Sequence, residues 1–141
     1  KARRAGEAYL EYLRLGGLLG FNELTPRLLK EILDRDHPVL AGLSATYLYR
    51  MPRERHHPDT HELVDDDVGG DPVGHFIVIS GYERWGRRFI VRDPSAHVPA
   101  SSDGRLVVDV QRLINSILLG DLTYDAVLLE LWPGPELGMA E

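Results

Sequence analysis

The chain has 141 residues, of which 43% are hydrophobic and 27% are charged, a composition typical of one ordered globular domain. Its formal net charge of -6 disfavours a nucleic-acid partner and an anionic membrane surface, because both are bound by clustered lysines and arginines. There is no cysteine and no apolar run of the roughly 20 residues that a spanning helix needs, so we expect a soluble, cytoplasmic protein without disulfides or membrane insertion.

The N-terminal part of the chain predicts two helices. Apolar residues recur at three- and four-residue spacing from Ala2 to Leu15, and Gly16-Gly17 ends this helix. Thr25 followed by Pro26 predicts the start of a second helix that runs to about Arg35. Threonine can cap the free amides of a helix, and proline fits the first turn, where its missing N–H costs nothing.

A buried strand and a long loop are predicted next. Pro38 to Thr46 is almost continuously apolar, as expected for a strand covered on both faces, and Tyr47 and Tyr49 could extend it. Met51 to Pro72 is rich in Arg, His, Asp, Pro and Gly and lacks a hydrophobic period. We therefore expect an exposed loop there, of the kind that often forms a lid or a binding element.

The same loop offers imidazole and carboxylate groups to a metal ion. However, Pro58 disfavours the helix that would place His57 and His61 on one face, and residues 65–70 do not match the calcium-loop pattern. We expect a solvated loop and predict no metal ligand and no cofactor.

The rest of the chain predicts hairpin-connected strands and one more helix. Four segments have strand patterns: Val73 to Glu83, Arg87 to Asp93, Leu106 to Val108 and Tyr124 to Trp132. Asp109 caps a helix that Gly120 closes, and residues 94–104 are irregular. Helices come mainly first and strands later, which indicates an α+β fold with N-terminal helices packed on a central antiparallel β-sheet. Residues 1–132 form the domain, and 133–141 form a tail or linker.

The first two of these strands form a hairpin. Its loop, Arg84-Trp85-Gly86, is read as a three-residue connection ending in glycine, because glycine adopts the left-handed conformation without penalty. If Glu83 faces Arg87, then Ile77 lies opposite Asp93. A shift of the register by one residue would instead reverse the faces of one strand.

This register makes His75 the diagonal neighbour of Asp93 on one otherwise apolar face, about 7–8 Å away at the backbone. A carboxylate that accepts a hydrogen bond from one imidazole nitrogen leaves the other nitrogen free to take a proton. His75 and Asp93 are therefore candidates for a general base and its orienting carboxylate.

Three short motifs then identify a family resemblance: Gly74-His75-Phe76, Gly81-Tyr82 and Asp93-Pro94. The segment resembles papain-like cysteine peptidases of the bacteriocin-processing, double-glycine-leader type, over about Thr25 to Trp132. The resemblance implies a papain-like fold, a peptide or protein substrate, and catalysis in which His75 is the general base and Asp93 orients it.

One departure from the family pattern affects activity. The family's nucleophile is a cysteine at a helix N-terminus, preceded by a glutamine, and this chain has neither residue upstream of His75. We expect the nucleophile segment to precede Lys1, because the chain does not begin with Met; the alternative is a degenerate domain that binds a peptide or protein without cleaving it. A serine nucleophile is disfavoured, because none begins a helix that would face His75: Ser44, Ser80, Ser95, Ser101, Ser102 and Ser116.

Overall fold

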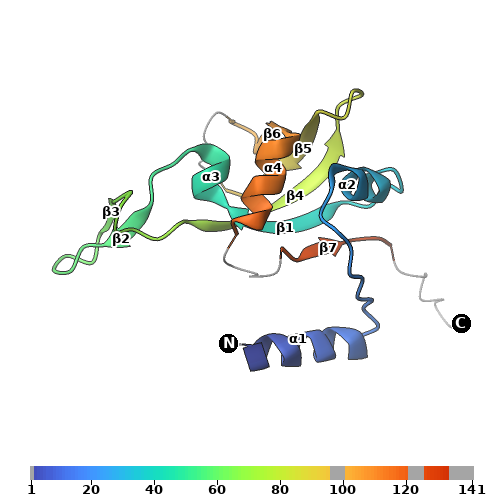
Figure 1. The fold of residues 1–141 in the computed structure, drawn as a ribbon, viewed down its shortest axis with the longest axis horizontal. Helices are drawn as coiled ribbons and strands as arrows, with labels where there is room; N and C mark the ends of the chain where they lie inside the picture. The colour runs from blue at the N-terminus through green and yellow to red at the C-terminus, as the bar shows by residue number, and fades with distance from the viewer. Residues whose placement is uncertain (1, 96–100, 121–125, 134–141) are drawn as a thin grey trace, which may run out of the picture.

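The computed structural model describes residues 2–95, 101–120 and 126–133, with side chains placed from residue 6 onward. Within these ranges, five strands form an antiparallel sheet in the order β6-β5-β4-β1-β7 (Figure 1). The strands are β1 (Val39–Ser44), β4 (Gly74–Tyr82), β5 (Arg88–Arg92), β6 (Arg105–Asp109) and β7 (Leu128–Glu130). The helices are α1 (Ala2–Arg14), α2 (Pro26–Leu33), α3 (Ala45–Tyr49) and α4 (Val110–Leu118). The predicted α+β fold class is confirmed.

The hydrophobic core lies on one face of the sheet, under α2 and α4. Leu29 of α2 and Ile117 of α4 are completely buried and belong to one cluster with strand residues such as Ile77 and Val91. Each fully buried side chain of this size contributes about 1.5–3 kcal/mol to stability. Helix α1 stands apart from the sheet in Figure 1, and its Leu10 and Leu13 side chains are exposed.

Both predicted capping residues begin their helices. The Thr25 hydroxyl accepts the Leu28 N–H at 3.1 Å, with Pro26 in the first turn of α2. The Asp109 carboxylate accepts the Gln111 N–H at 2.9 Å at the start of α4. These bonds satisfy amides that the first turn of a helix leaves unpaired.

The predicted extension of the first strand is wrong beyond Ser44. The Ser44 hydroxyl accepts the Tyr47 N–H at 3.2 Å, which starts the short helix α3, and Arg50 ends it in the left-handed conformation (φ 57°). The β-preferring tyrosines suggested a strand, but the N-cap bond and the burial of Leu48 favour a helical turn.

The segment from Met51 to Pro72 is largely exposed, as predicted, but it is not a loop throughout, because it contains two short strands. Strands β2 (Glu54–His56) and β3 (Leu63–Asp65) pair as a separate hairpin, which projects away from the main sheet (Figure 1). Asp66 stabilises the open end of this hairpin. Its carboxylate accepts the Gly69 N–H at 2.8 Å and lies 2.5 Å from Arg55 Nε. Polar residues of this kind are typical of loops, but here their side chains form the turn and cross-strand bonds of a hairpin.

The β4–β5 hairpin differs from the prediction at its turn and agrees with it at its open end. Tyr82 pairs with Phe89, and the Glu83 N–H donates to the Arg88 carbonyl at 3.0 Å, so the loop spans residues 84–87 and is one residue longer than predicted. Ser80 is an extra residue in β4, a bulge that shifts the register back, and Ile79 then pairs with Val91 as predicted. The longer loop shifts the pairing by one residue, and the bulge shifts it back. The residues at the open end of the hairpin therefore lie on the faces that were predicted. Gly86 is left-handed, as expected (φ 60°).

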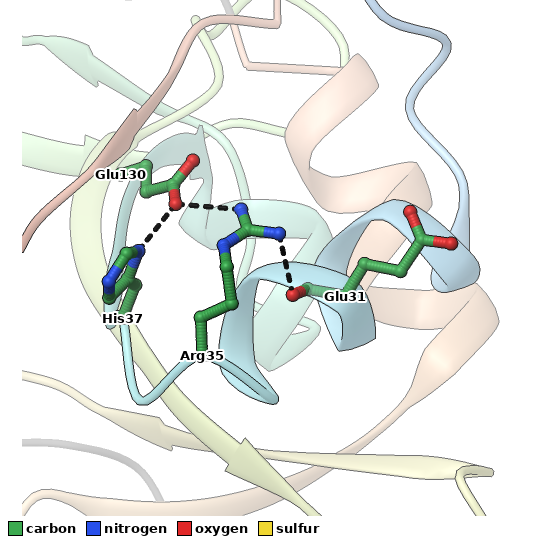
Figure 2. A network of polar contacts seen from close by, with 4 residues as sticks. All are labelled: Glu31, Arg35, His37 and Glu130. Atoms are coloured by element: carbon green, nitrogen blue, oxygen red, sulfur yellow. Dashed lines mark hydrogen bonds and ion pairs between the residues drawn. The ribbon is translucent and has the colours of Figure 1, made fainter.

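A small polar network holds strand β7 in place at the end of the sheet that lies away from the open end of the β4–β5 hairpin (Figure 2). Glu130 Oε1 lies 2.7 Å from Arg35 Nη2 and 2.6 Å from His37 Nδ1, and Arg35 also donates to the Glu31 carbonyl. His37 stacks on Trp132, with ring centroids 5.9 Å apart. This network joins β7 to the connection between α2 and β1.

Some sequence predictions fall outside the described residues. These are the start of the last strand at 124–125, part of the irregular stretch at 96–100, and all of the proposed tail except Pro133. In the described ranges, no helix combines the length and the apolar character required to cross a membrane.

Candidate functional site

The structure brings His75 and Asp93 together at the open end of the β4–β5 hairpin. His75 is the second residue of β4, and Asp93 directly follows β5. His75 Nε2 lies 2.8 Å from Asp93 Oδ1, which is the contact predicted from the hairpin. The carboxylate side chain is 1% exposed, whereas the imidazole is 27% exposed. The histidine is therefore the member of the pair that a ligand can reach.

Asp93 has two further hydrogen-bond donors. The Tyr49 hydroxyl donates to Oδ2, and the Ser95 N–H donates to Oδ1 at 2.7 Å. Burial favours the protonated carboxyl and on its own would raise its pKa, but the bonds from Tyr49, His75 and Ser95 outweigh this effect. The pKa of Asp93 is therefore lowered, and the group is a carboxylate at neutral pH.

The same contact acts on Tyr49 in the opposite direction. Burial of the phenol, followed by its bond to the Asp93 carboxylate, raises the pKa of Tyr49 well above its usual range. The hydroxyl thus keeps its proton and remains a donor to Asp93 at any physiological pH.

Tyr49 was not identified as a site residue from the sequence. It lies on α3, the segment that was predicted as a possible strand extension, and it meets Asp93 across 44 positions of the chain. Ser44, a favoured N-cap residue in front of Ala-Thr-Tyr-Leu-Tyr, was the available signal for a helix here. The contact to Asp93 itself has no local sequence signal.

Gly104, which directly precedes β6, fixes the backbone of Asp93. The Asp93 N–H donates to the Gly104 carbonyl at 2.8 Å. A Cβ atom on Gly104 would lie 2.5 Å from the Asp93 carbonyl oxygen, and Gly104 has a φ of 70°. Both the close approach and the left-handed backbone require glycine at this position.

The geometry of the pair defines which ring nitrogen can do chemistry. When Nε2 carries the imidazole proton, it donates to Asp93 Oδ1, and Nδ1 is left with its lone pair. Asp93 also stabilises the imidazolium that forms when Nδ1 takes a second proton. The arrangement can therefore act as an oriented general base.

Ser44 is the N-cap residue of helix α3. However, Ser44 pairs with Gly74, whereas its neighbour Leu43 pairs with His75. Alternate residues of a strand point to opposite faces, so the Ser44 side chain and the imidazole lie on different faces of the sheet. Its hydroxyl is also engaged by the Tyr47 N–H. The structure gives no support for a serine nucleophile at this position.

The histidines of the β2–β3 hairpin do not gather around a common point. His56 Nδ1 contacts the His61 carbonyl at 3.0 Å, and His57 Nδ1 accepts the Asp59 N–H at 3.3 Å. Among the described residues, no group of three or more His, Cys, Asp or Glu side chains is placed to hold a metal ion. These imidazoles serve the turn that connects the two strands.

Comparison with known proteins identifies a family. The model of the Peptidase_C39 like family matches residues 11–107, more than half of the chain, and this range includes His75, Asp93 and Tyr49. No curated protein and no solved structure matches the chain. The chain therefore belongs to the Peptidase_C39 like family and is a peptidase-like domain that contains no cysteine.

Proposed function

We propose that this chain is the His/Asp portion of a cysteine peptidase or amide hydrolase that acts on a peptide, with its nucleophilic cysteine supplied by sequence outside these 141 residues. In this proposal, His75 is the general base and Asp93 orients it. The main support is the 2.8 Å contact between an accessible imidazole and a sealed carboxylate, in a chain that belongs to a peptidase family. The resemblance to bacteriocin-processing peptidases favours a peptide substrate. A cytoplasmic location, expected from the lack of cysteine, belongs to the same proposal.

The proposed reaction moves a proton through His75 in each of its two halves. Nδ1 takes the proton of the cysteine thiol, and the thiolate sulfur attacks the carbonyl carbon of the scissile amide. As the C–N bond breaks, Nδ1 returns the proton to the leaving amine, and a thioester remains. His75 then takes a proton from water, whose oxygen attacks the thioester carbon. As the C–S bond breaks, Nδ1 gives this proton to the departing sulfur, which releases the acid and regenerates the thiol and the neutral imidazole.

Tyr49 fits this scheme as a positioning residue. The hydroxyl occupies Asp93 Oδ2, so the carboxylate presents Oδ1 to His75. Because the tyrosine holds its proton, it cannot become a competing base. It fixes the carboxylate that in turn fixes the imidazole.

The second candidate is a degenerate domain that binds a peptide or partner protein beside the His75–Asp93 pair without cleaving it. The observation in its favour is the lack of any cysteine in the 141 residues. The two candidates differ in whether a reactive thiol meets His75 in the full-length protein.

The test uses the full-length protein that contains this chain and a pooled peptide library read by mass spectrometry. We expect hydrolysis that iodoacetamide abolishes and that His75→Ala reduces to background. His37→Ala is the matched control, because His37 also contacts a carboxylate, Glu130 at 2.6 Å, but at the other end of the sheet. Full hydrolysis by His75→Ala or by the alkylated protein would refute the mechanism. Peptide binding without hydrolysis would favour the degenerate domain.

A further inference from the structure

A pocket lies beside α3 that the proposed reaction does not use. It is open to solvent, has a volume of about 460 Å³, and has apolar as well as polar lining; the polar residues are Ser44, Thr46, Tyr47, Arg50, Arg53 and Arg112. Successive residues of a helix are rotated by about 100°, so Tyr47 and Tyr49 point to opposite sides of α3. The pocket and the His75–Asp93 pair therefore lie on different sides of the same short helix.

Three arginines line this pocket, and no carboxylate is among the described residues that line it. In the described part of the chain, no ion pair involves Arg50, Arg53 or Arg112. Asp67 accepts the backbone N–H of Arg53 and not its guanidinium. In a chain with a net charge of -6, this is a local concentration of positive charge.

The hydroxyl groups in the pocket also have protons to donate. Ser44 Oγ accepts the Tyr47 N–H at 3.2 Å, and Thr46 Oγ1 accepts the Val73 N–H at 2.9 Å. Because each oxygen already accepts a backbone N–H, its own proton is available to an acceptor in the pocket. The side-chain groups offered to a ligand are thus mainly donors.

One of the arginines is held in position before any ligand binds. Arg112 Nη1 donates to the Tyr47 carbonyl at 2.8 Å, and its guanidinium lies over the Tyr47 ring, 5.3 Å from the centroid. A guanidinium with five donors can form this bond and still present a fork to an oxyanion. An oriented cation loses less conformational entropy on binding than a free one.

We propose that this pocket binds a carboxylate of a peptide ligand, either the C-terminal group or an acidic side chain. Guanidinium groups match the planar geometry of a carboxylate, and such charge-assisted bonds are stronger than neutral ones. The inference that the pocket binds an anion rests on the pocket residues alone, whereas the choice of a peptide carboxylate over phosphate rests on the proposed function. Since α3 also carries Tyr49, one helix links the anchored end of the ligand to the His75–Asp93 pair.

The test measures binding to the 15N-labelled chain by NMR, so hydrolysis is not required. Three alanine-based hexapeptides are compared: acetylated with a free C-terminus, acetylated and amidated with one internal glutamate, and acetylated and amidated without glutamate. We expect either or both carboxylate peptides to shift the amide signals of Thr46, Tyr47 and Arg112, and the uncharged peptide to leave them unchanged. Equal binding of all three peptides would overturn the proposal. Shifts with inorganic phosphate and with neither carboxylate peptide would overturn the assignment to a peptide.

Charge-matched variants test the location. The double variant R50Q/R53Q removes two pocket cations, and R84Q/R87Q removes two from the exposed tip of the β4–β5 hairpin. We expect R50Q/R53Q to weaken binding by about tenfold or more, because each lost charged hydrogen bond is worth about a factor of ten. R84Q/R87Q should bind like the wild type; an equal loss in both variants would show a general charge effect and overturn the site. His75→Ala should leave this binding unchanged, so a failure of the peptidase proposal is recognised separately.

Discussion

The Tyr49 hydroxyl donates to the carboxylate oxygen of Asp93 that His75 leaves free, so the two oxygens of one buried carboxylate have separate partners. Replacing Tyr49 by phenylalanine removes one donor and keeps the ring. We expect the pKa of Asp93 to rise and the free energy of unfolding to fall by about 1–3 kcal/mol, because a buried charged group loses a hydrogen bond. Urea unfolding and carboxyl 13C NMR measure the two effects.

Tyr82→Phe is the matched control for that variant. The Tyr82 hydroxyl donates to the Asp34 carboxylate at 2.6 Å, and this bond is exposed to solvent. Water can replace this bond, so we expect Tyr82→Phe to unfold at the same urea concentration as the wild type. Equal destabilisation by both substitutions would show that the Tyr49–Asp93 bond has no special role.

Asp93→Asn tests whether the carboxylate sets the histidine tautomer. An asparagine amide can donate to Nε2, which favours the tautomer with its proton on Nδ1 and removes the basic nitrogen. We expect the 15N spectrum of His75 to change from the Nε2–H form to a mixture or to the Nδ1–H form. An unchanged tautomer would contradict the orienting role. In the full-length protein, hydrolysis should fall by about 10⁴-fold, as when the carboxylate of a catalytic triad is replaced.

The sequence predicted the site because its central contact depends on a single hairpin. His75 and Asp93 are 18 positions apart, and alternation along two strands was enough to place them on one face. The prediction held although the loop is one residue longer, because the bulge at Ser80 restores the register. A bulge of this kind depends on packing and leaves no clear local signal, so the agreement was partly fortuitous.

Other features of the site depend on contacts between distant segments. Tyr49 reaches Asp93 only because α3 turns the chain after β1, and the tyrosines at 47 and 49 resemble strand residues in isolation. Gly104 was read as part of an irregular stretch, and its role follows from its distance to the Asp93 carbonyl. Helices α2 and α4 could be predicted, because their caps and apolar stripes are local.

The pH dependence of stability follows from two carboxylates. Burial opposes ionisation of both Asp93 and Glu130, but hydrogen bonds, from Tyr49 to Asp93 and from His37 to Glu130 among others, lower both pKa values below their ordinary values of 3.8 and 4.5. The unfolded chain therefore binds more protons than the folded chain in mild acid. Their contribution to stability is complete above the ordinary values and is lost as the pH falls through the folded values.

Urea unfolding from pH 6 to pH 3 measures this contribution. We expect the midpoint to decline below about pH 4.5, the ordinary value of Glu130. The double variant Asp93→Asn with Glu130→Gln should start from a lower midpoint at pH 6 and decline less steeply. A decline as steep as that of the wild type would show that other groups control the acid response.

Gly104→Ala tests whether the backbone beside Asp93 positions the site. The new Cβ would lie 2.5 Å from the Asp93 carbonyl oxygen, and alanine is disfavoured at a φ of 70° by about 1–2 kcal/mol. Both effects act on the residue that orients His75, so we expect lower stability and a changed 15N spectrum of the imidazole. Gly16→Ala is the matched control, because Gly16 also has a positive φ (90°) but has no atom within 4 Å of the added Cβ. It should leave the His75 spectrum unchanged. If Gly104→Ala also leaves that spectrum unchanged, the Gly104–Asp93 contact supports the fold and not the geometry of the site.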